Sequence, residues 1–193
     1  MIKIGLDMAQ NNCGYAIHSG KNLKFDSLVL TAKEKKELTK IDRIKRMTDW
    51  VFTKISPALH HKHQIILEGI YLGVNAKSCM WGCYTQGAFI YQYARLTGRT
   101  DISMPLAITA RKDIEDLRTR ASKAEIQIYV IDRFGLADID KSIRKEANQI
   151  LAEYQAKGMS SSTFNARMGK LSTRIKQETG IDEHMADAIV LTI

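Results

Sequence analysis

The sequence predicts an α/β fold in which helices flank a mixed sheet. Strand-like segments at residues 2–7, 13–18 and 23–30 are joined by tight polar turns such as "MAQNN", which favours an antiparallel meander. Further strands are expected at Gln64–Leu67 and 101–105, each after a helical segment. The order β-β-β-α-β-α-β, followed by helices, is typical of a sheet with helices on its faces.

Helices account for most of the remaining chain. A charged segment from about Lys35 to Ile55 carries its apolar residues on one stripe, with Pro57 just past its end. The apolar strand after it should pair parallel inside the sheet. Gly180 would end one helix, and Asp182 would cap the terminal helix from residue 183. The other helices are expected at 76–97, 106–117, 121–134, 138–157 and 162–178.

Size and charge limit the possible functions. The 193 residues are enough for one well-packed domain, residues 1–193, and few for two. The net charge of +8 favours an anionic partner, most commonly nucleic acid. The N-terminus enters a strand directly, without a signal or transit peptide, and no apolar stretch reaches membrane-spanning length. We therefore expect a cytoplasmic protein with no membrane partner.

A zinc site is one alternative for the middle of the chain. The sequence "HHKH" (His60, His61 and His63) precedes "CMWGC", which places Cys79 and Cys83 four residues apart on a predicted helix. Structural zinc sites usually use the tighter C-x2-C spacing. Two packed cysteines and a polar loop are the simpler interpretation.

Three acidic residues stand on otherwise apolar elements. Asp7 ends the first strand, Glu68 follows "IIL", and Asp187 lies within the terminal helix. A lone buried carboxylate is costly, so each acid needs a basic partner, a helix N-terminus or a metal ion. Carboxylates suit Mg²⁺ or Mn²⁺, and two such ions about 4 Å apart can hydrolyse a phosphodiester. In a basic protein, three such acids favour a metal site over three separate ion pairs.

Four blocks of the sequence extend this hypothesis: "IGLDMAQNNCGYAI", "IILEGIYLGVNAKSCMWGCYTQGAF", "RTRASKAEIQIYVIDRFGL" and "DEHMADAIVLTI". In content and order they resemble the RuvC-like Holliday junction resolvases. The resemblance implies a ribonuclease H-like fold, a homodimer, and a Mg²⁺-dependent endonuclease in which Mn²⁺ can substitute, with no small-molecule cofactor. Its substrate would be four-way or other branched DNA, cut by paired nicks that leave a 5′-phosphate and a 3′-hydroxyl.

The resemblance also assigns roles near the predicted metal. It makes Asp7, Glu68 and Asp187 the metal-binding acids. His184, one helical turn before Asp187, would be a fourth ligand or would position the scissile phosphate. A plain polar residue in a first helical turn is the alternative for His184. Asp182 is better explained as a helix cap, although it is close enough to act as a substitute ligand.

DNA contacts are expected from four residues of the same blocks. Tyr71 occupies the family's aromatic position, which stacks on bases, unless the ring only packs. Lys123 matches a basic residue near the scissile phosphate. Arg118 and Arg120 beside it are either contacts to the DNA backbone or part of a solvated basic face.

Two departures from the family pattern matter. The helical stretch 138–179 is unmatched and resembles an insertion, as in phage members of the family, which would act in the bacterial host cytoplasm. Its basic residues would extend the phosphate contacts or widen the dimer surface. Met8 and Ala9 stand where the family often has Pro-Gly. That difference also disfavours the actin-like ATPases, whose phosphate loops need glycine there.

Two other functions stay open. The chain can be a branched-DNA-binding protein with little or no nuclease activity, because a sequence does not show that its acids are positioned for turnover. It can also be a broader nuclease that acts on replication forks, flaps or RNA–DNA hybrids, since one fold supports several activities.

Overall fold

The computed structural model describes residues 1–193 apart from 71–75, 113, 115–116 and 119–120. Its centre is a five-stranded mixed sheet in the order β3-β2-β1-β4-β5. β1, β2 and β3 pair antiparallel, whereas β4 pairs parallel with both β1 and β5. The predicted meander and the parallel fourth strand are therefore confirmed. The strands are β1 (Ile2–Met8), β2 (Asn12–Ser19), β3 (Asn22–Val29), β4 (His63–Leu67) and β5 (Ile102–Ser103).

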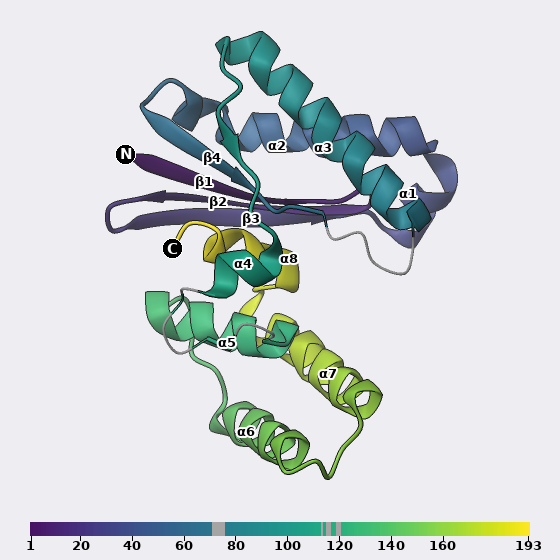
Figure 1. The fold of residues 1–193 in the computed structure, drawn as a ribbon, viewed down its shortest axis with the longest axis vertical. Helices are drawn as coiled ribbons and strands as arrows, with labels where there is room; N and C mark the ends of the chain where they lie inside the picture. The colour runs from purple at the N-terminus through teal and green to yellow at the C-terminus, as the bar shows by residue number, and fades with distance from the viewer. Residues whose placement is uncertain (71–75, 113, 115–116, 119–120) are drawn as a thin grey trace.

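Helices cover both faces of this sheet. Figure 1 shows α2 and α3 on one face and α4, α5 and α8 on the other, with α6 and α7 farthest from the sheet. The bounds are α1 (Ala32–Glu37), α2 (Lys40–Leu59), α3 (Ala76–Thr97), α4 (Ala107–Lys112), α5 (Lys123–Phe134), α6 (Lys141–Gln155), α7 (Ser161–Thr179) and α8 (Glu183–Val190). Among the described residues, no helix is long and apolar enough to cross a membrane.

Successive side chains of β1 point alternately to the core face and to the site face of the sheet. Ile4, Leu6 and Met8 are buried in the core that the sheet forms with α2 and α3. Because successive side chains of a strand point to opposite faces, Gly5 and Asp7 face the other side, where α8 lies. The first strand therefore serves both the core and the site.

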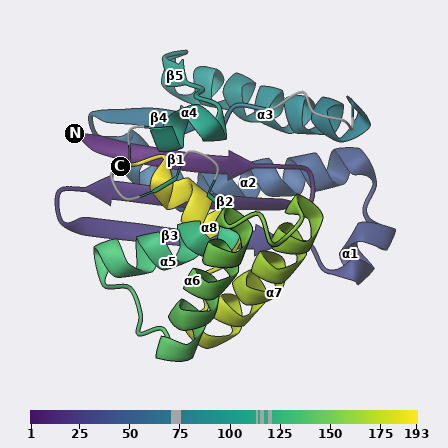
Figure 2. The ribbon, with the colours of Figure 1, turned by 60° about the horizontal axis from the view of Figure 1, so that its bottom comes forward.

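Gly5 and Gly14 let α8 lie directly on β1 and β2 (Figure 2). A Cβ atom on Gly5 would lie 2.1 Å from the Ala188 carbonyl oxygen, and one on Gly14 would lie 2.2 Å from the His184 carbonyl oxygen. Both distances are far inside van der Waals contact, so a side chain at either position would push the helix away. The two glycines thus set how close α8 comes to the end of β1.

The prediction of one helix from about Lys35 to Ile55 is wrong in its bounds. The structure has two helices, α1 and α2, separated by Leu38 in an extended conformation and by Thr39. Thr39 forms a capping box, whose side-chain oxygen satisfies a backbone N–H at the start of α2 and so favours a new helix there. Pro57 was expected past the helix end but lies inside the last turn of α2, because residues after a proline can still bond backwards.

The other elements fall close to their predicted ranges. The strand expected at 101–105 is reduced to β5, and the helix expected at 106–117 is described only as α4, since part of the remainder lies outside the described residues. The predicted fold class, a mixed sheet flanked by helices, is confirmed.

Candidate metal centre

The three predicted acids meet at one end of β1. Leu6 in β1 is paired with Leu67 in β4, and the backbone N–H of Glu68 donates to the Leu6 carbonyl at 2.9 Å, so Glu68 lies beside Asp7. Asp187 reaches the same point from α8. One carboxylate oxygen of each acid lies within 4.8 Å of the others. A set of oxygen ligands from three elements is what Mg²⁺ or Mn²⁺ binds in proteins.

The cluster is electrostatically unbalanced. Arg111 Nη2 donates to Asp187 Oδ1 at 2.7 Å, and both side chains are only 14% exposed. Burial, followed by the charges of Asp7 and Asp187, raises the pKa of Glu68 far above its usual range, although Arg111 opposes the shift. Burial also raises the pKa of Asp187 to about 6. A divalent cation would supply the positive charge that the cluster lacks, so the residues fit a metal ion.

His184 belongs to the same cluster. Its Nδ1 donates to Asp7 Oδ2 at 2.7 Å, and the side-chain amide of Asn12 contacts its Nε2 at 2.6 Å. Burial alone would lower the pKa of His184, but the hydrogen bond to Asp7 and the neighbouring carboxylates raise it above its usual value. His184 is therefore fixed next to one of the candidate metal ligands.

The residues that begin α8 support this arrangement. Asp182 caps the helix, since its Oδ1 accepts a backbone N–H of the first turn at 3.0 Å and its Oδ2 accepts the Ser27 hydroxyl at 2.6 Å. Its interpretation as a cap is confirmed. Lys123 Nζ lies 2.5 Å from Glu183 Oε1, and Glu183 in turn lies beside His184. The predicted basic residue is therefore near the cluster.

The other predicted DNA contacts do not join the cluster in the described residues. The Arg118 guanidinium donates to both carboxylate oxygens of Glu125, at 2.8 and 2.7 Å, and lies over the ring of Phe164. Its visible role is to hold the start of α5. Tyr71 and Arg120 lie outside the described residues, so their DNA contacts stay predictions.

Sequence reasoning misses three residues of the site. Arg111 lies in a segment predicted simply as a helix, and only the packing of α4 against α8 brings it to Asp187. Asn12 belongs to the polar turn after β1. Gln86, on α3, donates its amide to the Glu68 carbonyl at 2.7 Å. The one available signal was the basic character of Arg111, in the short stretch between two predicted site segments.

The zinc alternative finds no support in the part of the chain that the structure describes. His63 is buried in β4, where its Nδ1 contacts the His61 carbonyl at 2.7 Å and its Nε2 contacts the Tyr93 hydroxyl at 2.9 Å. Cys83 is exposed on α3, so the expectation of two packed cysteines is wrong for this residue. Among the described residues, the acidic cluster is the only group of three or more candidate ligands.

Comparisons with known proteins bear on the fold. No protein-family model matches the chain, and neither does any curated protein. The chain is similar to T. thermophilus RuvC in complex with a Holliday junction substrate, with a TM-score of 0.54 and 12% identity, over 100% of this chain and 90% of that one. It is also similar to another Thermus thermophilus RuvC structure, with a TM-score of 0.52 and 13% identity, over 93% of this chain and 97% of that one. The chain therefore has the RuvC-like fold that the sequence predicted.

Proposed function

We propose that this chain is a Mg²⁺-dependent endonuclease that resolves four-way DNA junctions by paired nicks, with Mn²⁺ able to replace Mg²⁺. The observation that carries the proposal is the cluster of Asp7, Glu68 and Asp187, whose oxygens lie within 4.8 Å of one another. These carboxylates would hold divalent ions, which when bound would supply an activated water and stabilise the leaving oxygen of a phosphodiester. The likeness in fold to a RuvC bound to junction DNA supports the choice of substrate.

The side chains around the acids would have separate tasks. Arg111 neutralises Asp187 in the absence of an ion, and once a cation takes over that role its guanidinium can turn to a phosphate oxygen. His184 is held by Asp7 and Asn12. We assign it to positioning the scissile phosphate or to a fourth ligand position.

DNA binding would draw on residues around this centre. Lys123 is close enough to the start of α8 to contact a phosphate near the cut, if it exchanges Glu183 for DNA. Tyr71 and Arg120 are proposed as a stacking and a backbone contact, respectively. Arg118 would have to leave Glu125 before it reached a phosphate.

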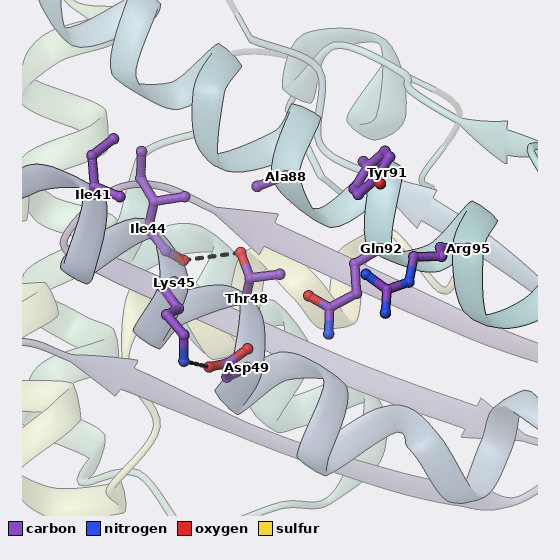
Figure 3. Close-up of a pocket in the computed structure, with 9 residues that line it drawn as sticks. All are labelled: Ile41, Ile44, Lys45, Thr48, Asp49, Ala88, Tyr91, Gln92 and Arg95. Carbon is purple, nitrogen blue, oxygen red and sulfur yellow. Dashed lines mark hydrogen bonds and ion pairs between the residues drawn. The ribbon is translucent and has the colours of Figure 1, made fainter.

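We further infer a homodimer from the exposed face of α3. Met80, Tyr84 and Tyr91 are 41%, 53% and 68% exposed and lie with Gly87 at 4-3-4 spacing, the repeat of paired helices. Of these residues, Tyr91 also lines a groove of about 310 Å³ between α2 and α3 (Figure 3). A two-fold dimer would present two metal centres to the two opposed strands of a junction. The variant Tyr91→Glu should then be a monomer by light scattering, whereas an unchanged dimer would place the interface elsewhere.

The organisation of the chain completes the proposal. The stretch 138–179, which contains α6 and α7, is taken as an insertion within a single domain. We place the activity in the cytoplasm, that of a bacterial host if the protein is phage-encoded. Three arginines of the insertion already pair with acids, so they would extend phosphate contacts only by breaking these pairs: Arg144–Asp132, Arg167–Glu153 and Arg174–Glu146.

A cleavage assay on matched branched substrates tests the function. End-labelled four-way junction, fork, flap and linear duplex would be incubated with Mg²⁺ or with EDTA. Paired symmetric nicks in the junction that are lost in EDTA, with 5′-phosphate and 3′-hydroxyl ends, are expected. Equal cutting of forks and flaps would broaden the activity to branched DNA. Tight binding without metal-dependent cutting would instead favour the alternative, a branched-DNA-binding protein with little or no nuclease activity.

A further inference from the structure

A polar cavity lies next to the candidate metal centre. It has a volume of about 340 Å³ and lies between the β1–β2 turn, the start of α2 and the start of α3. We call it the lysine–indole pocket, and its polar lining consists of Gln10, Asn11, Asn12, Lys40, Lys77 and Trp81. Asn12 links the two sites, because it also contacts His184, which is bonded to Asp7.

The lining offers hydrogen-bond donors without matching acceptors. The Trp81 indole N–H and the Gln10 amide nitrogen are buried and have no hydrogen-bond partner among the described residues. The ammonium group of Lys40 lies 4.5 Å from the centre of the Trp81 ring, which holds one positive charge beside the indole. No acidic side chain is present among the described residues that line the pocket. Such a set of groups suits an anion.

The positions of the two lysines also favour an anion. Lys40 is the first residue of α2, and Lys77 is the second residue of α3. The N-terminus of a helix carries partial positive charge, so a lysine there is unfavourable unless an anion is nearby. The first turn of α2 already holds Asp42, whereas that of α3, a helix of 22 residues, holds no acid, so the argument applies to Lys77. An anion in the pocket would meet both lysines and the positive end of the α3 dipole.

The amide of Asn11 is also oriented by a neighbour. Its Oδ1 accepts a hydrogen bond from Arg43 Nη1 at 3.2 Å, so the amide presents its N–H groups rather than its oxygen to a further partner. The polar cavity on the other side of His184 differs, because Asp182 and Glu183 line it and would repel an anion. Of these two cavities beside the centre, the lysine–indole pocket is therefore the one suited to phosphate.

We propose that the lysine–indole pocket binds a backbone phosphate of the cleaved strand, within a few nucleotides of the scissile phosphate. The inference rests on the proposed function, since it assumes that the adjoining acids cut DNA. Gln10 follows Asp7 by three residues, which limits their Cα separation to about 11 Å. With a rise of about 3.4 Å per nucleotide, the bound phosphate lies roughly one to three nucleotides from the cut.

Salt dependence of binding provides the first test. The variant Lys40→Gln/Lys77→Gln is compared with Lys21→Gln/Lys24→Gln, which also removes two exposed charges, from the hairpin at the opposite end of the sheet. Both are made in an Asp7→Asn background, so that bound junction stays intact in Mg²⁺. The pocket variant should bind about tenfold more weakly and lower the slope of log K against log salt by about 1 to 2. Equal slopes for the two variants would overturn the proposal.

Neutral methylphosphonate linkages locate the contact. Placed one at a time along the cleaved strand, they should weaken binding by the protein with an intact pocket at one position, one to three nucleotides from the nick. The pocket variant should lose its sensitivity at that position only, and Trp81→Phe, which removes the indole N–H, should lose part of it. Sensitivity that persists in the pocket variant contradicts the inference. If the native chain cuts no junction, the proposed function fails separately, because these measurements record binding.

Discussion

The metal centre and the helical unit of α5, α6 and α7 both gather charged residues, but in opposite ways. In the helical unit three arginines each face one acid, in the pairs Arg144–Asp132, Arg167–Glu153 and Arg174–Glu146. At the candidate metal centre three carboxylates lie together, and the described contacts pair only one of them, Asp187, with an arginine. Exposed one-to-one pairs add little to stability, and their removal leaves no buried charge behind. The unbalanced cluster costs stability unless a cation binds, so the difference marks where the fold serves a ligand.

The largest expected effect comes from removing one acid of the cluster. Asp7→Asn should lower the rate of junction cleavage at least about a hundredfold, because even groups that only support metal ligands cost 10–100-fold. Junction affinity should change little. Asp132→Asn in the helical unit is the matched control and should cleave at the native rate. Substantial cleavage by Asp7→Asn would remove this residue from the reaction.

Removing the arginine that pairs with Asp187 should have a smaller effect on the same assay. Arg111→Gln takes away the group paired with Asp187 and the proposed phosphate contact, so we expect cleavage to fall by about 10–100-fold. The comparison is sharpest at saturating Mg²⁺, where metal binding no longer limits the rate. An unchanged rate would show that Arg111 serves only the metal-free protein.

Substitutions at two glycines test how tightly the candidate metal centre and the helical unit are packed. Gly14→Ala forces a Cβ against the His184 carbonyl, and we expect a loss of about 1–3 kcal/mol in the free energy of unfolding together with slower cleavage. Gly169 lies within α7 with no atom within 4 Å of an added Cβ. Gly169→Ala should therefore gain up to about 1 kcal/mol. Urea denaturation measures both, and losses of equal size would mean that α8 does not need its close approach.

The repulsion in the cluster should also appear as a pH effect. The raised pKa of Glu68 means that the folded state keeps a proton which the unfolded state loses above about pH 4.3. The metal-free protein should then lose stability as pH rises from there toward the raised pKa. Glu68→Gln removes this loss, so in EDTA at pH 8 its melting temperature should exceed that of the native chain.

Mg²⁺ provides the reverse experiment. Mg²⁺ should raise the free energy of unfolding of the native chain by about 2.7 kcal/mol at a hundredfold excess over Kd. This stabilisation should be larger at pH 8 than at pH 6. Glu68→Gln should respond weakly at either pH. A melting temperature of the metal-free native chain that does not fall as pH rises to 8 would argue against charge repulsion in the cluster.

The smallest effect is expected in the helical unit. The side chains of Arg174 and Glu146 are 44% and 43% exposed, and such pairs usually contribute less than about 1 kcal/mol. Arg174→Gln should therefore unfold almost like the native chain and cleave junctions at the same rate. A marked fall in junction affinity would instead assign this arginine to DNA binding.

The sequence predicts the parts of the site that lie on regular patterns. Asp7, Glu68 and Asp187 stand out because each carboxylate interrupts an apolar strand or helix, and β4 was expected to run parallel to its neighbour. Arg111 and Asn12 do not stand out, since their partners depend on how α4 and α8 pack.

Local signals were also available but outweighed. The capping box of Thr39 with Asp42 is a sequence signal for the start of α2, and hence for the break after α1. The apolar stripe continues across this break and therefore suggested one helix. The roles of Gly5 and Gly14 could not be predicted from the sequence, because they depend on the packing of α8. A glycine in a strand does not indicate which backbone segment approaches it.

The most direct test of the central claim is a crystal of the protein soaked with Mn²⁺. An anomalous difference map should show one or two peaks about 2.1–2.2 Å from carboxylate oxygens of Asp7, Glu68 and Asp187, with the Arg111 guanidinium displaced from Asp187. No peak at the acids, with the Arg111–Asp187 pair intact at millimolar Mn²⁺, would contradict the account.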